Sequence, residues 1–196
     1  FRTESGYSDL RRPDKVYFVK DIKEDLSRRD FTMNAIAFSL NGEITDPFGG
    51  QTDIKNKVIK TVGDPYKRFS EDALRILRLF RFSSALDFSL EKNTLSAALE
   101  LTNELNKIST ERIVSELKKT LCSDFPENSM PLFETKALSF LGIESCPKLY
   151  NLKLIRKNTE LRMFAFLKES SKNAFETAKK LKLSRNETDK ISDLLY

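Results

Sequence analysis

The sequence has no histidine and no tryptophan, and only two of its 196 residues are cysteine. Without histidine, the chain cannot form a histidine general base, a Ser-His-Asp or Cys-His catalytic group, or a histidine metal ligand. Cys122 and Cys146 are too few for a cysteine zinc site or a disulfide framework. We therefore expect reduced thiols and a cytoplasmic protein.

Long apolar runs are also missing. No window approaches the roughly 18 uninterrupted apolar residues of a spanning helix, which predicts that the protein has no membrane partner. The chain begins at Phe1, with no initiator methionine and no signal-peptide hydrophobic region. We therefore expect that it does not start where its gene starts. The sequence carries no signal for an oligomeric state.

Basic residues are concentrated towards the C-terminus. Residues 148–185 hold eleven lysines and arginines against three glutamates, a surplus larger than the net charge of +5 of the whole chain. A basic segment beside a near-neutral remainder indicates a polyanion partner, most commonly nucleic acid. An ordinary lysine-rich helical surface explains the same charge equally well.

The first part of the chain, residues 1–62, mixes strand and turn signals. Residues 16–19 and 58–61 are short runs of strand-forming residues, and Asn41-Gly42 is a hairpin turn signal between residues 35–40 and 43–45. We expect a small mixed α and β domain here.

The second part, residues 63–121, has a helical period. Asp64-Pro65 and Ser70-Glu71-Asp72 have the chemistry of helix starts, and further helices are expected over residues 91–106 and from Ser109. One apolar stripe follows helical spacing: Ala73, Ile76, Leu77 and Phe80. This pattern predicts an all-helical domain.

The third part, residues 122–196, is predicted to be a basic helical domain. Its first ten residues, 122–131, contain short polar residues and two prolines, which indicates a linker or long turn. Helices are clearest over residues 161–166, 174–183 and 187–195. The expected fold class is α+β, with helical domains after the mixed first part.

Two clusters of charged residues carry the candidate chemistry. In the first, the guanidinium groups of Arg28 and Arg29 suit phosphate oxygens, and the Asp30 carboxylate can accept hydrogen bonds from ribose hydroxyls. Taken alone, this cluster is better explained as a surface ion cluster at a helix start.

In the second cluster, Asp72 and Arg75 are three residues apart, and Arg78 and Arg81 continue in steps of three. Cytosine and adenine both present an amino donor beside a ring-nitrogen acceptor. One carboxylate and one guanidinium match that pattern, whereas guanine and uracil present the reverse order. The alternative is an Asp72–Arg75 salt bridge on a solvated helix face, but the density of arginine favours planar recognition.

Four ordered motifs resemble the class II tRNA nucleotidyltransferases, which are the CCA-adding enzymes, together with the bacterial poly(A) polymerases. They occupy residues 28–37, 46–50, 68–75 and 111–117. The opening residues 1–14 resemble the flexible loop before the Arg-Arg-Asp motif, and residues 181–184 resemble the body domain. The resemblance implies a remainder of a polymerase β-like nucleotidyltransferase head at 1–62, a helical neck at 63–121 and part of a body at 122–196.

The resemblance implies template-independent addition of C and A to the tRNA 3′ end, with CTP and ATP as substrates. By motif, Arg29 and Asp30 would contact triphosphate and ribose, Asp72 and Arg75 would select the base, and Arg78 and Arg81 would complete the nucleotide site. Residues implied to support the site are Arg28, Asn34, Glu71, Glu111 and Arg112. Residues implied to follow the RNA backbone are Lys153, Arg156, Lys157, Lys179, Lys180 and Lys182.

The metal site departs from the family pattern. Family members bind two Mg²⁺ ions through an Asp-x-Asp pair that follows a glycine-rich loop, but no two of the thirteen aspartates here are two positions apart. Gly49-Gly50 follows a strand break far from such a pair, and residues 187–189 are a poor substitute. We expect the metal carboxylates upstream of Phe1, no catalytic or metal residue within this chain, and no polymerisation by the chain alone.

Several alternatives stay open. Within the family, the protein could be a poly(A) polymerase or an enzyme that adds only CC or only A, because the base-selecting pair does not separate these activities. From another class, it could be a non-catalytic RNA-binding module without a head domain. A purely structural helical protein would leave both charged clusters unexplained.

Overall fold

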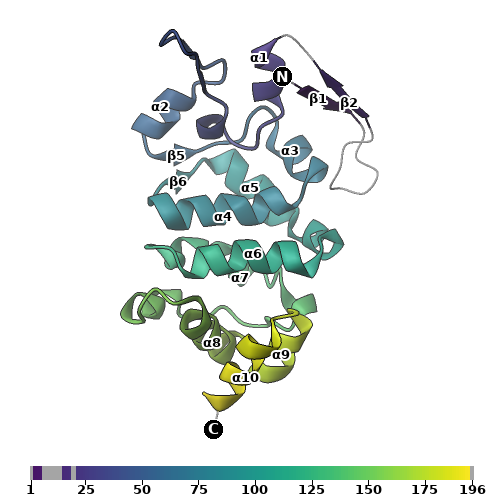
Figure 1. Cartoon of the computed structure of the whole chain (residues 1–196), viewed down its shortest axis with the longest axis vertical. Coiled ribbons are helices and arrows are strands. Elements are labelled where there is room, and N and C mark those ends of the chain that lie inside the picture. The colour runs from purple at the N-terminus through teal and green to yellow at the C-terminus, as the bar shows by residue number, and fades with distance from the viewer. Residues whose placement is uncertain (1, 6–14, 19–20, 195–196) are drawn as a thin grey trace. The chain divides into compact units, whose positions relative to one another are not determined.

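The computed structural model describes residues 2–5, 15–18 and 21–194, and the chain forms two compact units (Figure 1). The first unit contains Phe1–Arg75 and Phe88–Leu101, and the second contains Ile76–Asp87 and Thr102–Tyr196. Among the described residues, every strand lies in the first unit, while helices occur in both. None of the helices in these described ranges has the length and apolar character needed to cross a bilayer.

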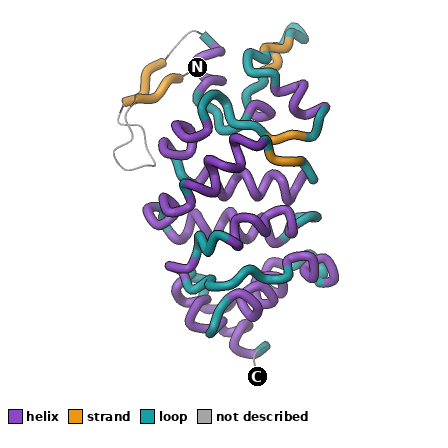
Figure 2. The backbone as a smooth tube through the Cα atoms, turned by 180° about the vertical axis from the view of Figure 1, so that it is seen from behind, coloured by secondary structure: helices purple, strands orange, loops and turns teal. Residues whose placement is uncertain are grey.

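The strands of the first unit are short (Figure 2). Antiparallel pairs join β1 (Arg2–Ser5) to β2 (Lys15–Phe18) and β3 (Ala37–Phe38) to β4 (Ile44–Thr45). The predicted hairpin at Asn41-Gly42 is confirmed, and Gly42 has the positive φ of 87° that favours glycine. The strand predicted at 58–61 is also present, as β5 (Val58–Ile59), but its parallel partner β6 (Ser89–Leu90) was not predicted.

The motif at residues 46–50 starts a helix. Asp46 accepts hydrogen bonds from the backbone amides of Gly50 (2.7 Å) and Gln51 (2.9 Å), the first residues of α2 (Gly50–Lys55). A Cβ atom on Gly50 would lie 2.2 Å from the carbonyl oxygen of Thr32 in η1 (Thr32–Asn34), so no larger residue fits there. Gly50 therefore serves the packing of α2, and Gly49, the N-cap of this helix, has a positive φ of 75°.

The remaining helices of the first unit are α1 (Ile22–Ser27), α3 (Pro65–Glu71), the first residues of α4 (Leu74–Leu86), and α5 (Lys92–Glu100). The predicted start at Asp64 is confirmed, because its carboxylate accepts hydrogen bonds from the amides of Tyr66 and Lys67. The start predicted at Ser70 is wrong, since Ser70 lies within α3. The break comes at Asp72, whose backbone is extended.

In the second unit, α4 continues and the predicted stripe is buried: Ile76, Leu77 and Phe80 are at most 3% exposed. The helix expected over 91–106 is interrupted after α5, and a 3₁₀ helix, η2 (Thr102–Lys107), follows. The later elements are α6 (Thr110–Leu121), η3 (Pro126–Ser129), α7 (Met130–Glu134), η4 (Ser139–Leu141), η5 (Leu149–Leu154), α8 (Thr159–Ser170), α9 (Ala174–Lys180) and α10 (Arg185–Asp193).

The segment at residues 122–131 is a packed turn rather than a linker. Ser123 and Ser129 are buried, and their hydroxyls donate to the carbonyls of Thr120 and Pro126 at 2.6 Å. The Phe125 amide donates to the Ser84 carbonyl of α4 at 3.0 Å. Short polar side chains bond the backbone of their own turn, so a polar composition does not imply a solvated linker.

Arg162 is a structural arginine inside the second unit. Arg162 is only 3% exposed, and its Nη1 donates to the carbonyls of Leu121 and Ser123 at 2.9 Å each. Its Nε and Nη2 both donate to the carbonyl of Ile155, at 3.2 and 3.0 Å. This guanidinium therefore joins α8 to the ends of α6 and η5.

We expect Arg162→Lys to lower the free energy of unfolding by roughly 2–4 kcal/mol, because one ammonium group cannot reach all three carbonyls. Urea denaturation followed by circular dichroism measures the change. The matched control is Arg156→Lys at an exposed arginine of the preceding loop, which should change stability little. Equal effects of the two substitutions would contradict the structural role of Arg162.

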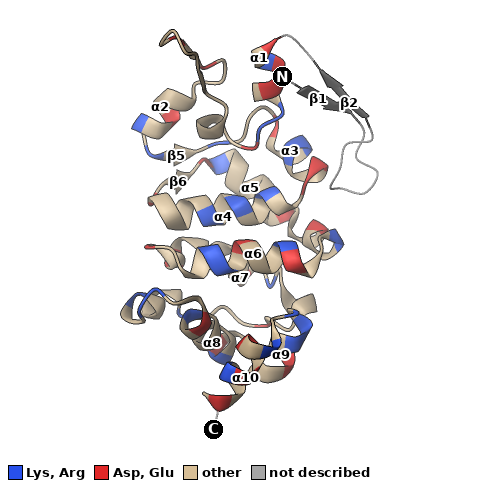
Figure 3. Ribbon diagram, in the orientation of Figure 1, with Lys and Arg blue, Asp and Glu red and all other residues tan. Residues whose placement is uncertain are grey.

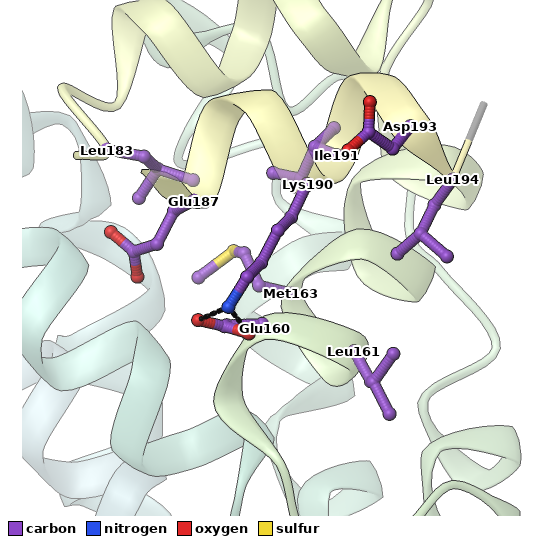
Figure 4. A pocket seen from close by; sticks show the side chains of 9 residues that line it. All are labelled: Glu160, Leu161, Met163, Leu183, Glu187, Lys190, Ile191, Asp193 and Leu194. Carbon is purple, nitrogen blue, oxygen red and sulfur yellow. Dashed lines mark hydrogen bonds and ion pairs between the residues drawn. The ribbon is translucent and has the colours of Figure 1, made fainter. Parts of the chain in front are cut away.

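The start of α10 is fixed by a capping box. The Ser184 hydroxyl accepts from the Glu187 amide, and the Glu187 carboxylate accepts from the Ser184 amide at 3.0 Å. Glu187 also bonds Lys118 Nζ of α6 at 2.5 Å, and Lys190 bonds Glu160 of α8 at 2.7 Å (Figure 4). Burial raises the pKa of Glu187, but the hydrogen bonds from Lys118 and Ser184 outweigh it, so its pKa lies below the ordinary 4.5.

This depressed pKa predicts a pH dependence of stability. The contribution of the Glu187 carboxylate is complete above pH 4.5 and is lost as the pH falls through the lower pKa of the folded state. We expect Glu187→Gln to be less stable than the parent protein at pH 7, with a difference that shrinks in acid. Thermal unfolding across this pH range tests it, and a difference that stayed constant down to acid pH would contradict it.

Candidate nucleotide-binding site

The Arg-Arg-Asp segment, residues 28–30, directly follows α1, and one buried carboxylate of that helix orients both arginines. Asp25 Oδ1 accepts from Arg28 Nη2 at 2.6 Å, and Asp25 Oδ2 accepts from Arg29 Nη2 at 3.1 Å. Arg29 remains about half exposed on its side chain, at 47%. Asp25 was not among the predicted site residues, although its spacing of three and four residues from the arginines is the signal for such pairs.

Asp30 is buried and is held by its own motif. Its Oδ1 accepts hydrogen bonds from the Phe31 amide and from Asn34 Nδ2, both at 2.9 Å. Its carbonyl accepts from the Val62 amide at 3.1 Å, beside the Phe31–Thr61 bridge. Asn34 therefore helps to hold the Asp30 carboxylate in place.

Glu71 joins two arginines of the 68–75 motif. Its Oε2 accepts from Arg68 Nη1 and from Arg75 Nη1, both at 3.0 Å. Arg68 also donates from Nη2 to the Ser27 carbonyl at 2.9 Å and from Nε to the Val62 carbonyl at 3.1 Å. The carboxylate thus fixes two guanidinium groups that reach the backbone on either side of the Arg-Arg-Asp segment.

Arg75 brings the two charged clusters together. Its Nη2 donates to the Arg28 carbonyl at 3.1 Å, and its Nη1 donates to the Arg68 carbonyl at 3.0 Å. Its side chain is only 12% exposed. Among the described residues, its carboxylate partner is Glu71 and not Asp72, so the alternative of a solvated Asp72–Arg75 salt bridge is wrong.

Asp72 lies at the junction of α3 and α4. Its Oδ1 accepts from the Leu74 amide at 3.1 Å, and its carbonyl accepts from the Arg75 amide at 3.0 Å. The carboxylate therefore acts as the N-cap of α4 and is partly exposed. The hydrogen bond from the Leu74 amide gives this side chain a fixed direction.

Arg78 and Arg81 lie farther along α4, in the second unit, and both pack on Phe82. The Cζ atoms of Arg78 and Arg81 are 5.4 and 4.0 Å from the centroid of that ring. Arg81 Nε also contacts Oε2 of Glu116 on α6 at 2.7 Å. Figure 3 marks the charged positions along α4 and α6. Glu116 is buried and was not among the expected site residues, since an i, i+3 pattern within one helix gives no sign of it.

The first turn of α6 holds the two remaining support residues. Glu111 is exposed and pairs with Lys182 Nζ at 2.8 Å, and this hydrogen bond holds the pKa of Glu111 below its ordinary value. Arg112 follows it and is half-buried. Glu111 thus connects α6 to the turn after α9 within the second unit.

Most lysines expected to follow the RNA are already in ion pairs. Lys153 pairs with Glu127 and Lys157 with Asp124, while Lys179 pairs with Glu176 at 3.0 Å. Within the ranges that the structure describes, Arg156 and Lys180 are exposed and have no ion pair. The charge count of residues 148–185 therefore overstates the basic surface, all the more because Arg162 is buried.

Comparison with known proteins places these motifs in a family. Residues 1–60 match the Poly A polymerase head domain, and residues 87–141 match the probable RNA and SrmB-binding site of polymerase A. The CCA-adding enzymes of Enterococcus faecalis and Lactococcus lactis are 49% identical over 150 residues and 47% identical over 171 residues. The chain belongs to the CCA-adding enzyme and poly(A) polymerase family. The matches cover 76% and 87% of this chain, which spans 36% and 41% of the length of these two relatives.

Solved CCA-adding enzymes have the same fold. The Bacillus stearothermophilus enzyme in complex with CTP has a TM-score of 0.83 and 34% identity, over 100% of this chain and 49% of that chain. The Thermotoga maritima enzyme complexed with tRNA has a TM-score of 0.68 and 26% identity, over 88% of this chain and 48% of that chain. The expected α+β fold, a remainder of the nucleotidyltransferase head followed by helical domains, is confirmed.

We expect Arg68→Ala to loosen the Arg-Arg-Asp segment, because the Ser27 and Val62 carbonyls lose their guanidinium donor. A loss of about 1.4 kcal/mol would make the Val62 amide, which bonds the Asp30 carbonyl, exchange roughly tenfold faster. Hydrogen–deuterium exchange measures this, with Lys67→Ala at the neighbouring exposed position as control. Unchanged exchange in Arg68→Ala would show that Arg68 does not hold the segment.

Proposed function

We propose that this protein takes part in the template-independent addition of C and A nucleotides to the 3′ end of tRNA. The observation that carries the proposal is the hydrogen bond from Arg75 to the Arg28 carbonyl, which brings the candidate base-selecting residues beside the Arg-Arg-Asp segment. The CTP and tRNA complexes of related CCA-adding enzymes support CTP, ATP and the tRNA 3′ end as partners.

Base selection uses the guanidinium hydrogens of Arg75 that do not bond the protein itself. Both Nη1 hydrogens are engaged, by Glu71 and the Arg68 carbonyl, and one Nη2 hydrogen is engaged by Arg28. Among the described residues, the Nε hydrogen and the second Nη2 hydrogen have no partner. They can donate to the ring nitrogen of C or A, while the Asp72 carboxylate accepts from the amino group.

Discrimination against G and U comes from the same two side chains. Those bases would place a ring N–H against the guanidinium and a carbonyl against the carboxylate, so donors would face donors and acceptors would face acceptors. Arg29 is proposed to bind the triphosphate and Asp30 the ribose, and Arg78 and Arg81 are proposed to complete the nucleotide site. Arg28, Asn34, Glu71, Glu111 and Arg112 are proposed to support it.

The residues of this chain do not fit the metal site that the family resemblance implies. No two aspartates are two positions apart, and among the described residues no group of three or more histidine, cysteine, aspartate or glutamate side chains could hold a metal ion. We therefore assign the Mg²⁺ ions to carboxylates outside these 196 residues. Nucleotide selection by Asp72 and Arg75 needs no metal contact.

The three-part division at residues 1–62, 63–121 and 122–196 stays part of the proposal, as head remainder, neck and body. The proposed RNA contacts are Lys153, Arg156, Lys157, Lys179, Lys180 and Lys182. A cytoplasmic location, which the two free thiols favour, belongs to the same proposal.

The test is nucleotide addition to a tRNA that lacks its CCA end, by the protein expressed from its complete reading frame. Ordered incorporation of two C and one A is the expected product. Incorporation of A alone, or of a long A tail, would replace this proposal with an A-adding enzyme or a poly(A) polymerase.

We expect Asp72→Asn to reduce the preference for CTP and ATP over GTP and UTP by roughly tenfold or more, because an amide presents a donor where the carboxylate only accepts. Asparagine is also a good N-cap, so α4 should keep its start. Asp64→Asn is the matched control, because Asp64 caps α3 in the same way outside the proposed base contact. Unchanged relative kcat/KM values for the four nucleotides in Asp72→Asn would remove Asp72 from base selection.

A further inference from the structure

The second unit has a basic hollow of about 480 Å³ beside the loop that joins η5 to α8. Four cationic residues line it, Lys153, Arg156, Lys157 and Arg162, together with the single carboxylate of Asp124. Leu154 and Ile155 complete its wall, and Leu154 is almost fully exposed. The family match to an RNA-binding region ends at residue 141, before this loop.

The positive charge of the hollow is only partly compensated. Arg162 donates its hydrogen bonds to three backbone carbonyls. These carbonyls carry no net charge, so they do not neutralise the guanidinium. Lys157 pairs with Asp124, and their side chains are 52% and 59% exposed. Lys153 pairs with Glu127, which does not line the hollow, so Arg156 and Arg162 are the lining cations without a carboxylate partner in the part of the chain that the structure describes. The hydrogen bond from Lys157, followed by attraction from Lys157, Arg162 and Lys153, holds the pKa of Asp124 below its ordinary value. Asp124 is therefore an exposed anion within a cationic site.

Other candidate surfaces in this unit lack this combination. The hollow of about 290 Å³ between α8 and α10 is mainly apolar, and the Lys190–Glu160 pair occupies its polar side (Figure 4). Lys179 and Lys182 are paired with Glu176 and Glu111 and line neither hollow. Of these surfaces, the loop at residues 153–157 is the one that combines basic side chains with a hollow.

We propose that this hollow is a phosphate-binding site for the tRNA backbone, in which an RNA phosphate replaces Asp124 as the partner of Lys157. This inference rests on the proposed function and assigns one site of tRNA contact. Arg156 supplies a planar guanidinium for the phosphate oxygens, and Lys153 and Lys157 supply ammonium groups.

The exchange of Asp124 for a phosphate is physically reasonable because the ion pair that breaks is exposed. Such pairs contribute about 0–1 kcal/mol, so their loss costs little. A backbone phosphate contacts several cations at once and releases counterions from the RNA, which favours binding at low salt. Asp124 competes with the phosphate, so its charge should weaken RNA binding rather than support it.

The experiment measures binding of the protein expressed from its complete reading frame to a fluorescently labelled tRNA that lacks its CCA end, by anisotropy over a range of salt concentrations. We expect Lys157→Gln to weaken binding roughly threefold to tenfold and to reduce the salt slope by about one. Asp124→Asn should tighten binding roughly threefold, because it removes the competing anion and frees Lys157.

The matched controls are Lys172→Gln and Glu144→Gln. Lys172 and Glu144 form another exposed lysine–carboxylate pair of the same unit, 2.8 Å apart and outside the hollow. Both controls should leave tRNA affinity nearly unchanged. Equal tightening by Asp124→Asn and Glu144→Gln would overturn the site, because general charge would then account for the effect.

Two further outcomes separate this inference from the proposed function. If the chain binds tRNA but neither Lys157→Gln nor Asp124→Asn changes the affinity, the site is wrong while the proposed function stands. If this protein does not bind tRNA at all, both the site and the proposed function fail. Inorganic phosphate at constant ionic strength should compete poorly, since it makes only one such contact. Displacement of tRNA by low concentrations of inorganic phosphate would assign the hollow to a free phosphate ligand instead.

Discussion

The Glu71 carboxylate accepts a hydrogen bond from Arg68 and another from Arg75, and the charged part of the first unit depends on this arrangement. The two guanidinium groups are mostly buried, and the carboxylate that they share places a negative charge between them and offsets their mutual repulsion. With Glu71 in place, their other N–H groups reach backbone carbonyls before and within the Arg-Arg-Asp segment. Backbone contacts thus connect the two motifs, which leaves the side chains of Arg29 and Asp72 partly exposed.

The same arrangement recurs at four arginines of the candidate site. Asp25 holds Arg28 and Arg29, Glu71 holds Arg75, and Glu116 contacts Arg81. In each case a carboxylate fixes one edge of the guanidinium, so the remaining donors have a defined direction before any ligand binds. A preorganised donor loses less conformational entropy on binding than a free side chain does. Such positioning also makes recognition of a base by two side chains geometrically selective.

Short-range chemistry made much of the fold predictable, whereas long-range pairing did not. The Asn41-Gly42 hairpin, the cap at Asp64 and the buried stripe of α4 follow from residues within a few positions of one another. The pairing of β5 with β6 and the burial of Arg162 depend on segments that are distant in sequence, and nothing local indicates them. The site residues were found by motif, but two of their carboxylate partners were not. Glu116 lies on another helix, whereas Asp25 is three and four residues from its arginines, a local spacing that indicates such pairs. At Arg75, a salt bridge to Asp72 was the alternative that the sequence left open. The backbone of Asp72 is extended at the end of α3, and the ion pair of Arg75 is with Glu71, four residues away.

Burial and pairing also change what the basic segment can do. A count of lysines and arginines treats Arg162, which binds carbonyls, and Arg156, which is exposed, as equal contributors to RNA affinity. The structure separates cations that are committed to the fold from cations held by exposed carboxylates, and only the second group can exchange partners at small cost. An exchangeable contact suits an RNA that is recognised through its backbone, because phosphate contacts position a nucleic acid without reading its sequence. The contacts that read identity would then be the fixed ones at Asp72 and Arg75, where a mismatched base leaves polar groups unpaired.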